Sequence, residues 1–424
     1  MKVFKFGGAS VKDAEAVKNV ANIINLYNDN LVIVVSAMGK TTNVMEKIAE
    51  AYFSKDSSEA ERLVKEVTAF HQNIIKNLGL ENTKPLETIG ALFSNLEQKI
   101  ASEPSSNFDF EYDQIVSYGE VISTTIISEY LNLIGTDCRW FDARKLIRTS
   151  NKHREAKVDW ETTKENVFSH IDAYLSPRGK QRIGITQGFI GHNENGQTTT
   201  LGREGSDFSA SILAWCLNAE EVIIWKDVPG VLNADPKYFD DCKKLNKISF
   251  REAIELSYFG ASVIHPKTIK PLQNLGIPLF VKSFINPKEA GTEIQSSLEN
   301  DTLIPSFIFK QNQILISISP KDFSFIAEDN LSEIFECFSK IGIKISLMQN
   351  SAISFSVCVD NVPNRIKKII GTLSENYSVK YNDGLELLTI RHYDNDTIQK
   401  LITNKEVLVE QKSRHTARFV MKIN

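Results

Sequence analysis

Cysteine is scarce and scattered in this chain of 424 residues. The five cysteines are odd in number, form no C-x-x-C pair and lie far apart, at Cys138, Cys216, Cys242, Cys337 and Cys358. This pattern is poor material for a disulfide framework or a zinc site, so we interpret these residues as reduced thiols.

The sequence also lacks long apolar runs and an excess of one charge. Met1 leads directly into the alternating segment Lys2–Phe6, and no stretch resembles a signal peptide or a membrane-spanning helix, which favours a cytoplasmic location. The formal net charge is only -4, which excludes a strongly basic nucleic-acid groove or membrane anchor. The expected partners are small molecules or further copies of the chain, without nucleic acid or membrane.

The first two thirds of the chain alternate between β-branched runs and amphipathic stretches, which predicts an α/β sheet covered by helices on both faces. The expected strands are Lys2–Phe6, Leu31–Ser36, Thr136–Phe141, Arg182–Thr186, Glu221–Trp225 and Pro278–Phe284. The expected helices are Asp13–Tyr27, Asn43–Phe53, Val121–Leu133, Ser206–Leu217 and Phe250–Leu256. The segment Ser54–Ser106 has helical spacing and no strand pattern, so we expect a helical excursion from the sheet.

The polar segment Asn286–Asn300 is the best domain boundary by turn chemistry. We therefore expect one domain over 1–294 and a second region over 303–424. The second region shows short βαβ units, which predict two small α+β units. The first covers about 313–381, and the second, apparently abbreviated, combines about 304–309 with 385–424.

The first chemical signal is Lys5-Phe6-Gly7-Gly8-Ala9-Ser10, directly after the first strand. Two residues without Cβ let backbone N–H groups approach phosphate oxygens, and Lys5 adds a fixed positive charge. Taken alone, a Gly-Gly pair after a strand is more often a tight turn. Further along, Ser36, Gly39 and Thr42 lie at or just after the carboxyl end of the strand Leu31–Ser36. This is the end at which open α/β sheets bind ligands.

The densest polar motif is Thr198-Thr199-Thr200-Leu201-Gly202-Arg203-Glu204-Gly205-Ser206-Asp207 at a helix entrance. Arg203 offers a planar fork for a carboxylate or phosphate, and Asp207 could cap the helix. The alternative is a capped loop with a solvated arginine.

Three further loops complete the pattern. The loop after Ile223 reads Trp225-Lys226-Asp227-Val228-Pro229-Gly230, a nucleotide cradle or only a tight connection. His265, before a proline, suits a structural hydrogen bond better than catalysis. Glu120, in Tyr118-Gly119-Glu120, either occupies the first turn of the helix Val121–Leu133 or binds a substrate ammonium group.

The ordered set KFGGAS, SYGE, TQGFIG, TTTLGREGSD, WKDVPGVLNADP and FGASVIHP, followed by a paired tail, resembles the aspartate kinases of the amino acid kinase family. The resemblance covers nearly the whole chain. It implies a three-layer αβα sandwich followed by two ferredoxin-like ACT domains, which commonly mediate dimerisation. It implies phosphorylation of the β-carboxylate of aspartate by ATP with Mg²⁺, the first step toward lysine, threonine and methionine, under feedback regulation.

The same resemblance assigns roles to individual residues. Lys5 and Asp207 are the catalytic pair. The residues that it implies bind ATP and its phosphates are Lys5, Gly7, Gly8, Ser10, Lys226, Asp227, Leu232, Lys237, Ser262 and Val263. The residues that it implies bind aspartate are Ser36, Thr42, Glu120, Arg203, Gly205 and Ser206. No side chain is assigned to the metal, which the ATP phosphates would hold.

The chain departs from the family pattern in places. Ala9 replaces a usual threonine, Leu232 a tyrosine and Ser262 a lysine. In the tail, Ser346 and Ala352 stand where lysine-inhibited relatives carry acidic residues, although Ser346 and the segment Met348-Gln349-Asn350-Ser351 still resemble an effector-site loop. A plain strand connection is the alternative for that segment.

Two other functions remain open from the sequence. One is a related kinase of the same family, acting on glutamate, carbamate or UMP. The other is a catalytically inactive amino-acid sensor, which the presence of both Lys5 and Asp207 disfavours.

Overall fold

The computed structural model describes residues 1–81, 85–176, 180–261, 264–299, 301, 304–322 and 324–422. The chain divides into two compact units. The first contains Met1–Val231, Lys244–Ile254 and Val263–Asn300, and the second contains Leu232–Lys243, Glu255–Ser262 and Asp301–Asn424. Two segments inside the predicted catalytic domain thus group with the second unit. In the part of the chain described, no helix combines the length and apolar character needed to cross a membrane.

The first unit is built on a sheet that is parallel from its first edge to β9. Its order in the described residues is β3-β4-β2-β1-β7-β9-β10-β8. The strands are β1 (Lys2–Phe6), β2 (Leu31–Val35), β3 (Cys138–Phe141), β4 (Ile183–Gln187), β7 (Glu221–Lys226), β8 (Lys247–Ser249), β9 (Leu279–Ser283) and β10 (Thr292–Gln295). A separate hairpin joins β5 (Ile190–His192) to β6 (Thr198–Thr200).

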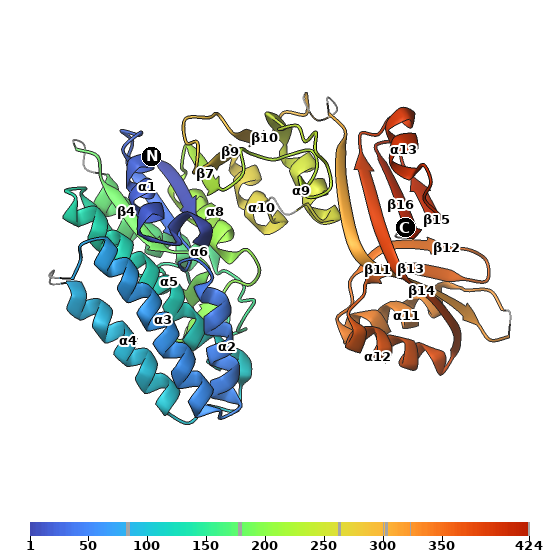
Figure 1. Cartoon of the computed structure of the whole chain (residues 1–424), viewed down its shortest axis with the longest axis horizontal. Coiled ribbons are helices and arrows are strands. Elements are labelled where there is room, and N and C mark those ends of the chain that lie inside the picture. The colour runs from blue at the N-terminus through green and yellow to red at the C-terminus, as the bar shows by residue number, and fades with distance from the viewer. Residues whose placement is uncertain are drawn as a thin grey trace. The chain divides into compact units, whose positions relative to one another are not determined.

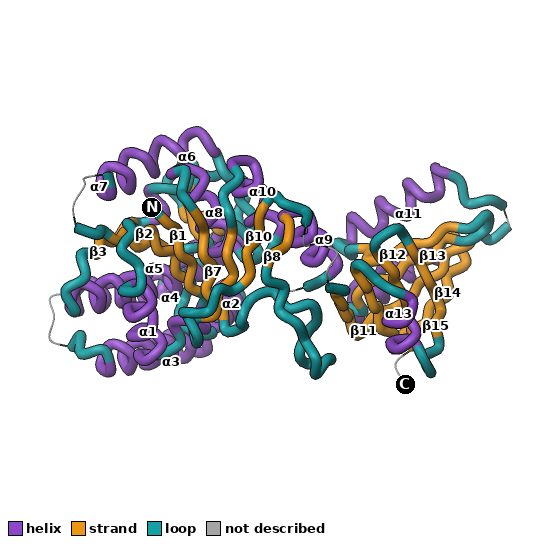
Figure 2. Tube along the Cα trace, turned by 90° about the horizontal axis from the view of Figure 1, so that it is seen from above, coloured by secondary structure: helices purple, strands orange, loops and turns teal. Residues whose placement is uncertain are grey.

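Helices cover both faces of this sheet, which gives the predicted three layers (Figure 2). One layer holds α1 (Ala14–Ile24), α3 (Ser57–Asn77), α4 (Pro85–Ala101) and α5 (Phe108–Leu133), with α2 (Thr41–Phe53) packed on α3 and α5. The opposite layer holds α6 (Trp160–Val167), α7 (Ala173–Leu175), α8 (Gly205–Leu217) and α10 (Pro266–Leu275). The helix α9 spans Phe250–Phe259.

The central strands are apolar because both of their faces are covered. All five residues of β2 are buried, and Phe4 and Phe6 of β1 pack against Trp225 of β7. Continuous burial is typical of parallel strands between two helical layers. The parallel order also places the carboxyl ends of β1, β2, β4 and β7 at one edge, where loops distant in sequence can meet.

One local prediction for this unit was wrong, and one segment contains a strand that was not predicted. Glu120 does not precede a helix, because α5 begins at Phe108 after the Asn107 cap and Glu120 lies in its interior. The macrodipole of a first turn therefore cannot explain this carboxylate. The predicted boundary segment Asn286–Asn300 contains β10, which pairs with both β9 and β8. The sequence did not predict this strand, because the segment is polar and the strand has only four residues.

The second unit has an antiparallel sheet of order β12-β13-β11-β14-β16-β15 in the described residues (Figure 1). Its strands are β11 (Ser306–Pro320), β12 (Ile345–Asn350), β13 (Phe355–Asp360), β14 (Tyr377–Arg391), β15 (Val407–Lys412) and β16 (Thr416–Lys422). Its helices are α11 (Glu328–Ile341), α12 (Pro363–Ser374) and α13 (Asn395–Ile402).

The two long strands β11 and β14 link the two halves of this sheet. One half of each belongs to the set with α11 and α12, and the other half belongs to the set with α13, β15 and β16. The strand expected over 304–309 is the first part of β11, where Phe307 pairs with Ile390. Two units of α+β texture thus share one sheet, consistent with ACT domains.

Candidate active site

A cavity of about 800 Å³ opens at the carboxyl edge of the parallel strands in the first unit. Its lining includes nine residues assigned from the sequence, namely Lys5, Ser36, Thr42, Glu120, Arg203, Gly205, Ser206, Asp207 and Lys226. The strands β1 and β7 deliver the two lysines, and α8 delivers Asp207. Because these elements are neighbours only in the folded sheet, the cavity joins residues more than 200 positions apart in sequence.

An ion pair between Lys5 and Asp207 lies at the base of this cavity. Lys5 Nζ is 2.7 Å from Asp207 Oδ1, and Lys226 Nζ is 3.9 Å from Asp207 Oδ2. Asp207 is only 3% exposed, so these ammonium groups take the place of water around its carboxylate. Asp207 does not cap α8, since the N-cap is Glu204, in a left-handed conformation at φ 53°. The carboxylate instead holds Lys5 at the end of β1.

The glycine loop after β1 passes very close to the loop after β2. Gly8 lies in a short 3₁₀ turn, and its carbonyl accepts from the Gly39 N–H at 3.0 Å. A Cβ on Gly8 would lie 2.6 Å from the Gly39 carbonyl oxygen, whereas a Cβ on Gly7 would lie 3.3 Å from Lys5 Nζ. Gly8 is thus required by the fold, and Gly7 leaves room for the lysine ammonium.

These contacts predict different effects for substitutions at the two glycines. Gly8→Ala should lower the free energy of unfolding by about 1–3 kcal/mol because backbone must shift, and turnover should fall with it. Gly7→Ala should keep the melting temperature and still lower kcat, because the new methyl group displaces the Lys5 ammonium. Thermal melts and initial rates of both variants check this. Equal loss of stability in the two would contradict the distinction.

Glu120 projects from the middle of α5 toward the same cavity and is only 2% exposed. Its Oε1 accepts from the Ala37 N–H at 3.3 Å, while Oε2 has no hydrogen-bond partner among the described residues. Burial raises the pKa of Glu120 to about 8. A buried carboxyl group with one unpaired oxygen is prepared to receive a cation.

Arg203 stands at the entrance of α8 and is exposed to the cavity. Gly202 and Glu204 both have positive φ, so the chain turns sharply on each side of Arg203. Arg203 makes no ion pair with any acidic residue in the described part of the chain. Its guanidinium is therefore available for an anionic ligand.

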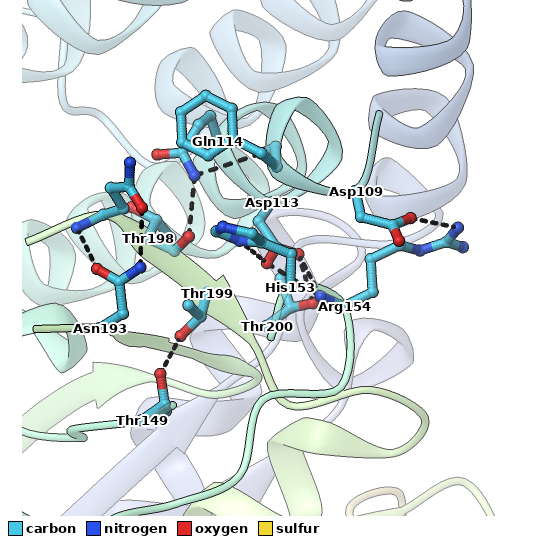
Figure 3. A network of polar contacts seen from close by, with 12 residues as sticks. Asp109, Asp113, Gln114, Thr149, His153, Arg154, Asn193, Thr198, Thr199 and Thr200 are labelled. Carbon is cyan, nitrogen blue, oxygen red and sulfur yellow. Dashed lines mark hydrogen bonds and ion pairs between the residues drawn. The ribbon is translucent and has the colours of Figure 1, made fainter. Parts of the chain in front are cut away.

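A second set of cavity residues, missed from the sequence, comes from the segment 152–155. Asp113, fully buried on α5, anchors this segment through His153 and Arg154 (Figure 3). Its carboxylate accepts from His153 Nδ1 at 2.8 Å, from the Arg154 N–H at 3.0 Å and from Thr200 Oγ1 at 2.7 Å. Burial raises the pKa of Asp113, and these donors oppose that rise. The signal in the sequence was weak, because a single acid five residues before Tyr118-Gly119-Glu120 resembles an ordinary helix residue.

Asp113→Asn should loosen the segment, because one amide oxygen cannot accept from all three donors. We expect the KM for the acceptor substrate to rise about tenfold with a smaller change in kcat, and the protein to lose about 1–3 kcal/mol of stability. The matched control is Asp109→Asn, which removes a mostly exposed contact of 3.4 Å to the Arg154 guanidinium. Steady-state kinetics in which both variants behave alike would contradict the anchoring role.

Other residues assigned from the sequence lie outside the cavity lining. Ser10 is buried and donates to the Trp225 carbonyl at 3.4 Å, and Asp227 is exposed beyond the end of β7. Leu232 and Lys237 belong to the second compact unit, and Ser262 and Val263 lie outside the described residues. His265 caps α10 by accepting from the Lys267 N–H, which confirms its structural role.

The prediction of a loop at the effector segment was partly wrong. Met348, Gln349 and Asn350 belong to β12, and only Ser351 begins a turn, closed by a hydrogen bond to Ser354. Ser346, on the same strand, receives two cationic donors. Lys310 Nζ lies 3.1 Å from its hydroxyl, and Arg418 donates to its carbonyl at 2.7 Å.

Comparison with known proteins shows the family to which the chain belongs. The profile of the amino acid kinase family matches residues 1–283. The chain is 31% identical over 412 residues to lysine-sensitive aspartokinase 3 of Escherichia coli (strain K12), covering 96% of this chain and 89% of that protein. It is 29% identical over 395 residues to the aspartokinase of Chlamydia pneumoniae, covering 92% and 84% respectively.

The crystal structure of E. coli aspartokinase III in complex with aspartate and ADP superimposes with a TM-score of 0.83 at 28% identity, covering 100% of this chain and 96% of that one. The same enzyme in complex with lysine and aspartate also gives 0.83. The chain belongs to the amino acid kinase family and, within it, to the aspartokinases.

Proposed function

We propose that this chain transfers the γ-phosphoryl group of ATP to the β-carboxylate of L-aspartate, giving 4-phospho-L-aspartate and ADP. The observation that carries the proposal is the Lys5–Asp207 ion pair of 2.7 Å in one cavity with Glu120 and Arg203. Fixed cations and a buried carboxyl group in one cavity suit a substrate with an ammonium group and two carboxylates.

Aspartate would bind through its charged groups. Arg203 pairs with a carboxylate as a planar fork, and Glu120, once ionised, pairs with the ammonium group. The hydroxyls of Ser36, Thr42 and Ser206 and the backbone at Gly205 complete the contacts. Glutamate, longer by one CH₂, would place its reacting oxygen away from Lys5.

The transfer itself needs charge compensation more than a base. The attacking carboxylate oxygen carries a lone pair and no proton, but it must approach an anionic phosphoryl group. One unit charge pair at 4 Å is worth about 4 kcal/mol at an effective dielectric near 20, so each ammonium group matters. Lys5, held by Asp207, would contact the transferring group, Lys226 the phosphates, and the N–H groups at Gly7 and Gly8 the phosphate oxygens.

Magnesium would enter with the nucleotide. Among the described residues no group of three or more His, Cys, Asp and Glu side chains could hold a metal ion, and Asp207 is paired with lysine. The phosphates would therefore supply most of the ligands, and the ion would neutralise their charge.

A coupled assay of ADP release with aspartate, glutamate, carbamate and UMP tests the proposal. We expect turnover with aspartate alone. Turnover with one of the other acceptors and none with aspartate would replace it with a related kinase activity. Absence of turnover with all four, in a folded protein that binds ATP, would favour the amino-acid sensor.

We also infer an amino acid effector site along β12, at Ser346, Met348, Gln349, Asn350 and Ser351. This strand is an edge of its sheet, and Met348 is 51% exposed. The Lys310 ammonium and the Arg418 guanidinium both contact Ser346. Because these cations repel a further ammonium group, the site should disfavour a lysine side chain.

Thermal-shift measurements test this inference, since a ligand of the folded state raises its melting temperature. Threonine or methionine should raise the melting temperature more than lysine does at equal concentration. Ser346→Asp should reverse the order by compensating both cations. A larger shift with lysine in the unchanged protein would contradict the inference.

A further inference from the structure

A second pocket, of about 300 Å³, lies on the helical layer opposite α3 and α4. The helices α6, α8 and α10 form it, and α8 packs against both of the others. Its lining includes Trp160, Phe208, Trp215, Lys267, Lys270 and Pro271. None of these residues has a role in the proposed transfer reaction.

Aromatic rings form the walls of this pocket. The ring centroid of Trp160 lies 5.1 Å from that of Trp215 and 6.2 Å from that of Phe208, both edge to face. All three side chains are partly exposed, so they are not simply part of the core. Edge-to-face packing fixes the rings relative to one another, which leaves a rigid apolar slot.

Positive charge surrounds the slot. Lys267 and Lys270 line it, and Lys164 Nζ lies 5.4 Å from the centroid of the Trp215 ring. All three lysines are exposed, and none forms an ion pair with an acidic residue in the described ranges. Three ammonium groups without a close ion-pair partner in the described ranges, placed around aromatic walls, favour a ligand that is both anionic and apolar.

We propose that this pocket binds a small aromatic carboxylate. A flat ring system of one or two rings would lie against the exposed parts of these aromatic side chains, and its carboxylate would pair with Lys267 and Lys270. The volume is at the lower end of that of small-molecule sites, which suits such a ligand and excludes a nucleotide.

The pocket adjoins the loop that carries Gly202 and Arg203, and it remains separate from the catalytic cavity. Phe208 follows Asp207 on α8, so neighbouring residues of one helix face the two sites. Lys267 Nζ lies 3.7 Å from the position that a Cβ on Gly202 would occupy, beside Arg203. A carboxylate that draws Lys267 into the pocket would change the surroundings of this loop.

The test uses 1-naphthoate and its uncharged analogue 1-naphthalenemethanol, titrated into the full chain by calorimetry. We expect naphthoate to bind at least about tenfold more tightly than the alcohol. Binding should persist with saturating aspartate and ADP present, because the catalytic cavity is a different site. Equal affinity for the two probes, or displacement by aspartate and ADP, would overturn the proposal.

Variants in which lysines are replaced by glutamate test whether naphthoate binds in this pocket. Lys267→Glu/Lys270→Glu should weaken naphthoate binding at least about tenfold, whereas Lys65→Glu/Lys76→Glu, an equal charge change at exposed positions of α3, should not. Trp160→Leu should weaken both probes, because it removes an aromatic wall. Thermal melts verify that each variant is folded. Unchanged affinity in the Lys267→Glu/Lys270→Glu protein would also overturn the proposal.

Discussion

Replacing Lys5 by methionine should lower kcat about a thousandfold or more, while the variant still binds ATP and aspartate. Methionine keeps the length of the side chain and removes the ammonium group that faces the transferring phosphoryl group. Loss of one fixed donor to transition-state charge costs about 10²–10³ in rate, and this donor carries a full charge. Steady-state measurement of ADP release checks the rate.

The same substitution has a structural cost, which must be separated from catalysis. Asp207 would lose its partner at 2.7 Å and keep only Lys226 at 3.9 Å. Breaking one side of a buried ion pair costs about 3–5 kcal/mol. Lys5→Met/Asp207→Asn removes both charges and should recover much of the stability without recovering turnover. Activity close to that of the unchanged protein in either variant would refute the role given to Lys5.

Replacing Glu120 by glutamine should raise the KM for aspartate about a hundredfold, with little change in the KM for ATP. Removing one partner of a desolvated charge pair costs about 2–5 kcal/mol, and a hundredfold corresponds to about 2.7 kcal/mol. The control is Glu46→Gln, which changes another carboxylate of the cavity lining, bonded to the Tyr112 hydroxyl. Equal effects on the two substrates would argue against a contact between Glu120 and the ammonium group.

The raised pKa of Glu120 adds a dependence on pH with a defined sign. In the unfolded chain this carboxyl group loses its proton near pH 4.5, whereas in the folded protein it keeps the proton up to about pH 8. The folded state therefore binds more protons between these values, and its contribution to stability falls as the pH rises from about 4.5 to 8. Glu120→Gln should lack this decline, which denaturant unfolding at pH 5, 6, 7 and 8 can measure.

Substrate binding should follow the opposite trend. If the ionised form of Glu120 holds the ammonium group, aspartate binding at pH 7 releases a proton. Affinity for aspartate should then rise between pH 6 and 8, and calorimetry in buffers of different ionisation enthalpy should detect the released proton. Absence of proton release would contradict an ionised Glu120 in the complex.

Local patterns in the sequence were sufficient for much of the fold. The expected strand Lys2–Phe6 matches β1 residue for residue, and the expected helix Ser206–Leu217 matches α8 to within one residue, because their apolar spacing and flanking turns are unambiguous. Short elements such as β8 and β10 were missed, since three or four residues are too few to show a period. The start of α5 was missed because Gly119 interrupts the helical pattern near Glu120.

The sequence by itself identified several of the charged residues that line the cavity, namely Lys5, Lys226, Arg203, Asp207 and Glu120. The tertiary structure decided which of these residues form ion pairs and which are buried. The register of β1 between β2 and β7 brings Lys5 to Asp207, and burial in α5 gives Glu120 its raised pKa. It also made Asp113 an anchor for the segment 152–155. Ion pairing and desolvation depend on neighbours supplied by distant parts of the chain, and local sequence carries no record of them.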